Sequence, residues 1–226
     1  TGDDTRLRLL LASTDPGASV IEVIREDGTM PIPGYIRDGR AGHEDRELYQ
    51  TVFAKTEGSV AAPTAGLHLT PNLLDQIRRR GVRTAEVTLH VGPASFLPVR
   101  DIDNHEMPSE PFSVPDETRA LLYETRSQGG RVVAVGTTSA RTLESFVRLE
   151  RSTSGDEFVE TNLFVKPGFE FRAVDMLMTN FHQPGTTHLL LVAAFFGEDQ
   201  MADIYEHALQ GEYRFLSYGD AMLLQN

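Results

Sequence analysis

The sequence predicts an α/β fold in which a largely parallel sheet, barrel-like or open, is flanked by helices. From residue 58 onwards, short apolar segments of strand length alternate with helical patterns. Polar loops rich in Gly, His, Asn and hydroxyl residues follow several of these segments. Such loops are expected at the carboxyl ends of strands, where α/β sheets bind ligands.

The composition narrows the class of protein. The 226 residues are enough for one large or two small domains, with 40% hydrophobic and 24% charged residues, as in ordinary globular proteins. The longest apolar run, 189–196, is far shorter than the roughly 20 residues of a membrane span. The absence of cysteine excludes disulfides and thiolate metal sites and fits a cytoplasmic enzyme. A net charge of −12 argues against nucleic-acid binding over the whole surface but allows a local basic patch.

The N-terminal region divides into two parts. Residues 5–27 contain short β segments separated by Asp-Pro-Gly and Glu-Asp-Gly turns. Residues 30–47 are rich in Pro, Gly and charge, which is typical either of a functional loop or of a plain surface linker. Arginines and tyrosines mixed with glycine in and just after this stretch suit a stacked base and its phosphates. The candidate nucleic-acid contacts are Tyr35, Arg37, Arg40, Arg46 and Tyr49.

The next elements are a strand at 58–62, a helix from residue 71 and a strand at 84–91. The helix has Thr70 as its N-cap, Pro71 at its first position and Gly81 as its stop. The second strand alternates apolar and polar residues, which predicts a half-buried strand.

The remaining elements repeat the alternation of strand and helix. A helix over 114–130 starts with Pro115 and two acidic residues. Gly136 provides the turn from an apolar strand into the next helix. Strands are predicted at 131–135, 161–165 and 174–178, and further helices at 136–150, 189–196 and 198–209.

Four polar loops follow predicted strands: 63–70, 90–96, 136–142 and 179–187. One such loop would be ordinary turn chemistry, but four at equivalent positions indicate a shared pocket. In the third loop, a glycine turn at a helix start presents backbone N–H groups to an anion. Arg141 adds a candidate contact for a carboxylate.

Three histidines, His68, His90 and His182, lie at predicted strand ends. Three converging histidines can ligate zinc, which makes a metal-dependent hydrolase one function hypothesis. They lack the paired spacing of a His-Glu-x-x-His motif, so acid–base catalysis or substrate contact stays open as the alternative. Glu57 is a further candidate base, or else a solvated residue before a strand.

Six strings in order resemble one known family. They are YQTVFAKTEGSVAAPTAGLHLT, VTLHVGPASFLPV, GGRVVAVGTTSARTLES, LFVKPGFEFR, VDMLMTNFHQPGTTHLLLVAAFFG and YRFLSYGDAMLL. From about Met30 to Leu224 the sequence resembles the S-adenosylmethionine:tRNA ribosyltransferase-isomerases of queuosine biosynthesis. The resemblance implies transfer and isomerisation of the ribosyl part of S-adenosylmethionine onto 7-aminomethyl-7-deazaguanine in tRNA. The products would be epoxyqueuosine in tRNA, adenine and methionine.

The resemblance also implies roles for residues and partners. His68 or Glu57 would be the general base, and His182 would protonate the leaving adenine. S-adenosylmethionine would be a ribosyl donor, without a metal, and we expect a cytoplasmic monomer that acts on tRNA and binds no membrane. The expected cofactor-binding residues are Thr64, Gly66, His90, Gly136, Thr137, Thr138, Ser139, Arg141 and Asn180.

Two departures qualify the resemblance. Residues 1–29 would be the end of a small inserted β-domain and 30–226 an α/β catalytic domain whose first strands precede this sequence. A truncated relative that binds tRNA or S-adenosylmethionine without turnover is therefore an alternative. Residues 183–187 read Gln-Pro-Gly-Thr-Thr where the family usually has Leu-Pro-Lys-Ser-Thr, and His188 replaces a usual Leu.

Overall fold

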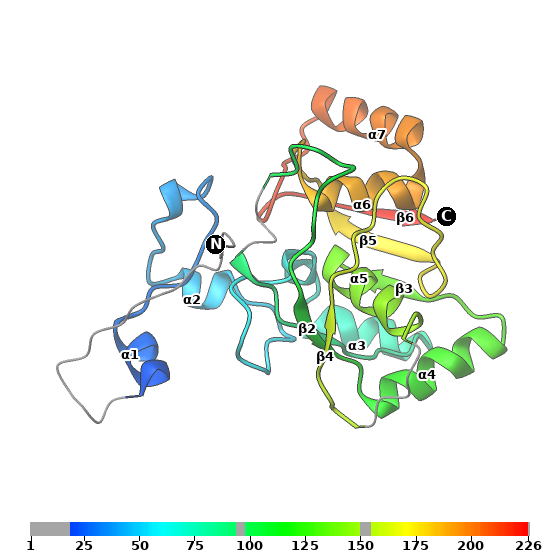
Figure 1. Ribbon diagram of the computed structural model, residues 1–226, viewed down its shortest axis with the longest axis horizontal. Coiled ribbons are helices and arrows are strands. Elements are labelled where there is room, and N and C mark those ends of the chain that lie inside the picture. The colour runs from blue at the N-terminus through cyan, green and yellow to red at the C-terminus, as the bar shows by residue number, and fades with distance from the viewer. Residues whose placement is uncertain (1–18, 94–97, 150–154, 226) are drawn as a thin grey trace. The chain divides into compact units, whose positions relative to one another are not determined.

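The computed structural model describes residues 19–93, 98–149 and 155–225, whose elements are shown in Figure 1. The chain divides into two compact units, Thr1–Arg46 and Glu47–Asn226. Within the described ranges, no helix has the length and apolar character needed to span a membrane.

The first described element of the first unit is a helix, where the sequence predicts β structure. Helix α1 (Val20–Asp27) starts at Ser19, whose hydroxyl accepts a hydrogen bond from the Glu22 N–H at 3.2 Å. The Glu22 carboxylate accepts one in return from the Ser19 N–H at 2.8 Å. This reciprocal cap outweighs the strand propensity of the valines and isoleucines that follow. The expected β segments are therefore wrong for 20–27, and the part at 5–18 lies outside the described residues.

The strands of the second unit form two three-stranded sheets, and together with the helices they confirm a mixed α/β fold. The first has the order β1 (Thr88–Leu89), β2 (Glu110–Ser113), β4 (Val159–Thr161). The second has the order β3 (Val133–Val135), β5 (Met176–Asn180), β6 (Ala221–Gln225).

The expectation of largely parallel pairing is wrong for the described strands. Only β3 and β5 pair in parallel, whereas β1–β2, β2–β4 and β5–β6 are antiparallel. Parallel strands need a crossover connection, usually a helix. Among the described pairs, only β3 and β5 are joined in this way. Strand β6 returns beside β5 in the opposite direction, with Leu177 opposite Leu224.

Several predicted strands also shift or disappear. Residues 58–62 form no strand, although the Val60 N–H donates to the Val91 carbonyl at 3.0 Å. The strand expected at 161–165 is β4, which ends at Thr161, and the one at 84–91 shortens to β1. The sequence predicts neither β2 nor β6.

The predicted helices are confirmed. The hydrogen bonds that cap a helix come from residues next to its ends, so they depend on the local sequence. Thr70 accepts a hydrogen bond from the Leu73 N–H at 3.2 Å, and Thr186 accepts one from the Leu189 N–H at the same distance. The turn η2 (Thr64–His68) precedes the first of these helices. The helices are α3 (Pro71–Arg79), α4 (Asp116–Ser127), α5 (Thr137–Phe146), α6 (Thr187–Phe196) and α7 (Glu198–Gln210).

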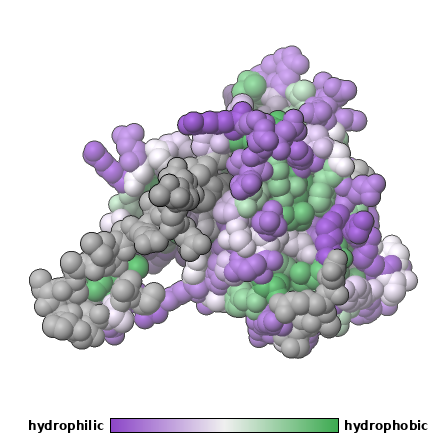
Figure 2. Space-filling model, in the orientation of Figure 1, coloured by the Kyte–Doolittle hydropathy of each residue, from purple (hydrophilic) through white to green (hydrophobic). Residues whose placement is uncertain are grey.

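One hydrophobic core serves both sheets. It contains a buried residue from every strand: Leu89, Phe112, Ala134, Val159, Leu177 and Leu224. Helix α5 packs on β3 and β5, and α6 lies beside α7 (Figure 1). Hydrophilic side chains predominate over α7 on the face in Figure 2. The ends of β3 and β5 are thus held by strands and helices that pack in one core.

Candidate functional site

Two of the predicted polar loops leave neighbouring strands at the same edge of the sheet. Strands β3 and β5 are in parallel register, with Val135 opposite Met178. The Gly136 N–H continues the ladder by donating to the Met178 carbonyl at 2.8 Å. The loop after Gly136 and the end of β5 at Asn180 are therefore adjacent, as the sequence predicts.

Gly136 is required by the backbone of its turn. Its φ of 90° and ψ of 150° lie in a region open essentially to glycine alone. A Cβ built on it would lie 3.7 Å from the Cβ of Ala65, so turn η2 packs against this glycine. No side chain caps α5 at Gly136, so the helix turns its N-terminal N–H groups towards this corner.

Asn180 joins η2 to β5 through its side-chain amide. The residue is 2% exposed. Its Oδ1 accepts a long hydrogen bond from the Thr64 hydroxyl at 3.5 Å. Its Nδ2 lies 3.2 Å from His68 Nε2 and donates to the Leu216 carbonyl at 3.1 Å. Three of the predicted site residues therefore form one hydrogen-bonded cluster.

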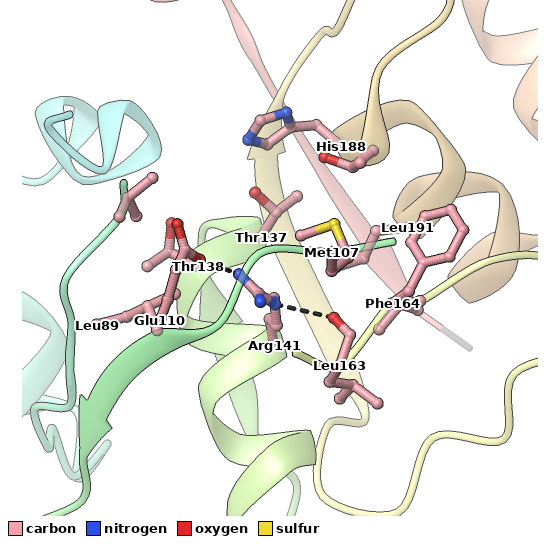
Figure 3. A pocket seen from close by; sticks show the side chains of 13 residues that line it. Leu89, Met107, Glu110, Thr137, Thr138, Arg141, Leu163, Phe164, His188 and Leu191 are labelled. Atoms are coloured by element: carbon pink, nitrogen blue, oxygen red, sulfur yellow. Dashed lines mark hydrogen bonds and ion pairs between the residues drawn. The ribbon is translucent and has the colours of Figure 1, made fainter. Parts of the chain in front are cut away.

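A small cavity lies where α5 and α6 begin (Figure 3). Its volume is about 40 Å³, which is room for one or two waters or for a carboxylate group but not for a nucleoside. Thr137 and Thr138 line it from the first turn of α5, and Thr187 and His188 from the first turn of α6. Two helix N-termini with three hydroxyl groups favour an anion.

Arg141 lies between Glu110 and Leu163 at the wall of this cavity (Figure 3). Its guanidinium forms an ion pair with Glu110 and donates to the carbonyls of Leu163 at 2.9 Å and Thr161 at 3.2 Å. The other oxygen of Glu110 accepts the Gly92 N–H at 2.7 Å. The carboxylate that Arg141 binds is thus that of a residue of the protein itself, Glu110. We therefore assign Arg141 a structural role in the wall of the cavity.

His182 and His188 form a pair beside the cavity, with ring centroids 5.2 Å apart. The Thr179 hydroxyl lies 2.9 Å from His182 Nε2, and the backbone N–H of His182 donates to the Tyr205 hydroxyl oxygen at 2.8 Å. Burial, followed by the charge of His188, lowers the pKa of His182 from 6.5 to about 3. Burial and then the charge of Arg141 lower the pKa of His188, while Glu110 acts in the opposite direction. Both rings are therefore neutral at neutral pH.

The other predicted groups lie in different surroundings. His90 stacks on Phe158 at 4.9 Å between ring centroids and packs against Gly58, and its buried Nδ1 has no hydrogen-bond partner. Glu57 is exposed. His68, His90 and His182 thus have separate sets of neighbours. In the described part of the chain, no group of three His, Asp or Glu side chains could hold a metal ion.

The candidate nucleic-acid residues of the first unit differ in accessibility. Arg37 pairs with the buried carboxylate of Asp45, and Arg46 donates to the Gly28 carbonyl at 3.1 Å. Arg40 is exposed, and Tyr35 is 49% exposed.

Tyr49 belongs to the second unit and is only 3% exposed. Its hydroxyl lies 3.3 Å from the Ser217 Oγ, and its ring meets Tyr218 edge-on at 5.8 Å. Base stacking requires an accessible ring face, which Tyr35 provides and Tyr49 does not.

Sequence reasoning missed the roles of three residues in this region, although it noted His188 as a departure from the family. Glu110 lies in an acidic stretch whose charges look solvated, and nothing local signals its pairing with Arg141. Leu216 contributes only a backbone carbonyl, which no side-chain pattern reveals. His188 could have been found, because a histidine in the first turn of an otherwise apolar helix is unusual.

Comparison with known proteins places these residues in a family. Residues 2–224 match the family described as Queuosine biosynthesis protein. A protein of Azoarcus sp. (strain BH72) named S-adenosylmethionine:tRNA ribosyltransferase-isomerase is 51% identical over 208 residues, or 91% of this chain and 59% of that protein. A protein of the same name from Citrifermentans bemidjiense is 47% identical over 219 residues, or 96% and 62%. The chain spans 58–62% of the length of the curated relatives it matches.

A solved structure shows the same similarity. The crystal structure of S-adenosylmethionine tRNA ribosyltransferase from Thermotoga maritima at 2.00 Å resolution aligns with a TM-score of 0.58. The sequence identity is 46%, and the alignment covers 70% of this chain and 50% of that one.

Proposed function

The chain belongs to the queuosine biosynthesis protein family, and we propose that its protein transfers and isomerises the ribosyl part of S-adenosylmethionine onto 7-aminomethyl-7-deazaguanine in tRNA. The products are epoxyqueuosine in tRNA, adenine and methionine. The observation that carries this proposal is the 51% identity to a relative of that name over 91% of the chain. The clustering of η2, the Gly136 turn and Asn180 at one sheet edge supports it.

The cavity between α5 and α6 supports a binding position for the methionine carboxylate. Its size suits a carboxylate, and the free N–H groups at the start of α5 would donate to it. The ribose and adenine would then lie outside the cavity, towards Thr64, Gly66 and Asn180 on η2 and β5. Neither Arg141, which binds Glu110, nor the buried Asn180 amide needs to contact the cofactor directly in this arrangement.

Two chemical steps require protein groups. The sulfonium acidifies the 5′ hydrogens of the ribose, so a general base can start the reaction by removing one. His68, beside Asn180, and the exposed Glu57 are the two candidates. The neutral amine of the modified base then forms a bond to a ribosyl carbon and gives up a proton. The ribosyl carbons reorganise into the epoxide-bearing ring of the product as the bonds to methionine sulfur and to adenine break.

The leaving adenine needs a proton, and we assign its delivery to His182 when the cavity is occupied. With a pKa of about 3, His182 carries no proton at neutral pH in the empty site. An anion beside His188 would favour the charged forms of both rings and raise their pKa values. Proton donation would thus depend on the bound methionine carboxylate.

We extend the proposal to the organisation of the whole protein. Residues 30–226 belong to an α/β catalytic domain, in which the two described sheets are parts of one barrel-like sheet. Residues 1–29 belong to an inserted domain. The protein is a cytoplasmic monomer that needs no metal, and its tRNA contacts include Tyr35, Arg37, Arg40 and Arg46. The accessible Tyr35 and Arg40 support this surface.

A product assay tests the function. The protein is incubated with S-adenosylmethionine and tRNA that carries 7-aminomethyl-7-deazaguanine, and free adenine and the mass of the tRNA are measured. We expect adenine release together with a matching gain in tRNA mass. Binding of both substrates without adenine release would favour the truncated, non-catalytic alternative.

A further inference from the structure

The orientation of the Asn180 amide is determined by a backbone group. A carbonyl oxygen only accepts hydrogen bonds, so the atom of Asn180 that lies 3.1 Å from the Leu216 carbonyl must be the NH₂ nitrogen. A flipped amide would place two oxygens against each other. Oδ1 then faces the Thr64 hydroxyl, which can donate to it.

The same amide determines which nitrogen of His68 carries the proton. The second hydrogen of Asn180 Nδ2 is directed at His68 Nε2, 3.2 Å away. Nε2 must therefore be the bare, accepting nitrogen of the neutral ring, and the proton must be on Nδ1. Nδ1 has no hydrogen-bond partner among the residues that the structure describes. It is also not one of their fully buried polar atoms.

The segment that provides this carbonyl is held in an unusual conformation. Leu216 has a φ of 71°, which is a strained region for a leucine. Its N–H donates to the Phe181 carbonyl at 3.0 Å, and its carbonyl also accepts the Gly219 N–H at 3.0 Å. The residue is therefore fixed on both sides, and with it the acceptor that orients Asn180.

From this geometry we infer that Asn180 is a positioning residue that holds neutral His68 with its proton on Nδ1, so that His68 presents a hydrogen-bond donor to the site. The lone pair of Nε2 is occupied by Asn180, which removes His68 from the two candidates for the base and leaves Glu57. The group that His68 would contact is an acceptor, such as a ribose oxygen, an adenine ring nitrogen or a carboxylate. This last assignment rests on the proposed function, whereas the tautomer does not.

Nitrogen-15 NMR of the histidine rings tests the tautomer without any turnover. Long-range proton–nitrogen correlations at alkaline pH distinguish the two ring nitrogens of each histidine. The set of signals that disappears in His68→Gln belongs to His68. We expect the protonated-type nitrogen shift at Nδ1 and the bare-type shift at Nε2. Free histidine favours the other tautomer, with its proton on Nε2. A His68 ring that nothing in the protein orients would therefore not give the expected shifts.

A variant of the positioning residue completes the NMR test. In Asn180→Ala the proton should move towards Nε2, while the signals of His105 and His207, which contact Phe164 and Tyr213, should stay unchanged and report an intact fold. The inference is overturned if His68 in the unsubstituted protein carries its proton on Nε2 or shows averaged shifts at both nitrogens.

Two substitutions at His68 separate a donor from a base in the adenine-release assay. An asparagine amide can place an N–H near the position of Nδ1, whereas a glutamine amide reaches the position of Nε2. A donor role predicts that kcat/KM of His68→Asn exceeds that of His68→Gln by about tenfold or more. Equal loss in both variants would overturn the donor role. Absence of adenine from the unsubstituted protein would contradict the proposed function but not the NMR result.

Discussion

The guanidinium of Arg141 binds the carboxylate of Glu110, and the two side chains are only 9% and 2% exposed. Arg141 lies on α5 and Glu110 on β2, so this pair ties the helix behind the candidate anion site to the other sheet. The remaining donors of Arg141 and the second oxygen of Glu110 bind backbone groups. The pair is therefore part of the cavity wall rather than a free ligand for substrate.

Breaking this pair should destabilise the fold strongly. Glu110→Ala leaves a buried arginine without its carboxylate and the Gly92 N–H without its acceptor. Removing one partner of a buried pair costs about 3–5 kcal/mol. Urea denaturation should show a loss of unfolding free energy of that size, and a variant as stable as the parent would contradict the structural role.

A double substitution is the matched control. Glu110→Leu combined with Arg141→Met leaves no unpaired charge, although the carbonyls of Thr161 and Leu163 lose a donor. It should recover much of the stability lost in Glu110→Ala. If the double variant were no more stable than the single one, the carbonyl contacts would outweigh the ion pair.

Gly136→Ala should damage both the turn and cofactor binding. The backbone conformation at φ 90° and ψ 150° is strained for alanine by about 1–3 kcal/mol. A shifted turn would also move the N–H groups of α5 from the cavity. We expect lower stability in urea and weaker binding of S-adenosylmethionine by calorimetry. Gly34→Ala, at a glycine with open space around it, should change neither.

Acidification should destabilise the fold through the buried histidine pair. The folded pKa of His182 is about 3 and its ordinary value is 6.5, so between these values the unfolded chain binds the proton more tightly. Stability is therefore complete above the ordinary value and falls progressively as pH falls towards the folded value. His188, whose pKa is also lowered, acts in the same direction.

The histidine contribution is measured by comparing His182→Gln with the parent at two pH values. Between about pH 8 and about pH 5, His182 alone should remove about 2 kcal/mol from the parent's unfolding free energy. The variant should lose less over the same interval. An identical pH dependence in parent and variant would show that His182 titrates normally in the folded protein.

Arginines of the first unit should contribute salt-dependent tRNA affinity. Arg40→Ala removes an exposed charge and should weaken tRNA binding, with a shallower dependence on salt concentration. Arg37→Ala should also disturb its own segment, because Arg37 pairs with buried Asp45. Arg79→Ala, an exposed arginine at the end of α3, is the control of equal charge. Equal effects at Arg40 and Arg79 would indicate a general charge effect.

The sequence predicts well those features whose cause lies within a few residues. Thr70, the predicted N-cap, accepts the Leu73 N–H where α3 begins. Gly136 predicts a turn into a helix, and parallel pairing of β3 and β5 then brings that turn to Asn180. Of the four predicted pocket loops, the two after β3 and β5 lie together because the carboxyl ends of these parallel strands share an edge.

Features that depend on distant partners were not predictable. Arg141 is an attractive substrate ligand in sequence, but the pairing with Glu110 comes from the meeting of α5 with β2. Helix α1 replaces the expected β structure because two side chains of one turn satisfy each other's backbone groups. The low pKa of His182 follows from burial, which no local pattern around the residue indicates.

The fate of the ribose of S-adenosylmethionine tests the central claim most directly. The protein is given tRNA that carries 7-aminomethyl-7-deazaguanine with S-adenosylmethionine labelled either in the ribose or in the methyl group. A ribosyltransferase-isomerase should place the ribose label in tRNA in step with adenine release, while the methyl label leaves as methionine. Methyl label in the tRNA, or a ribose label that stays with adenine, would contradict the proposed function.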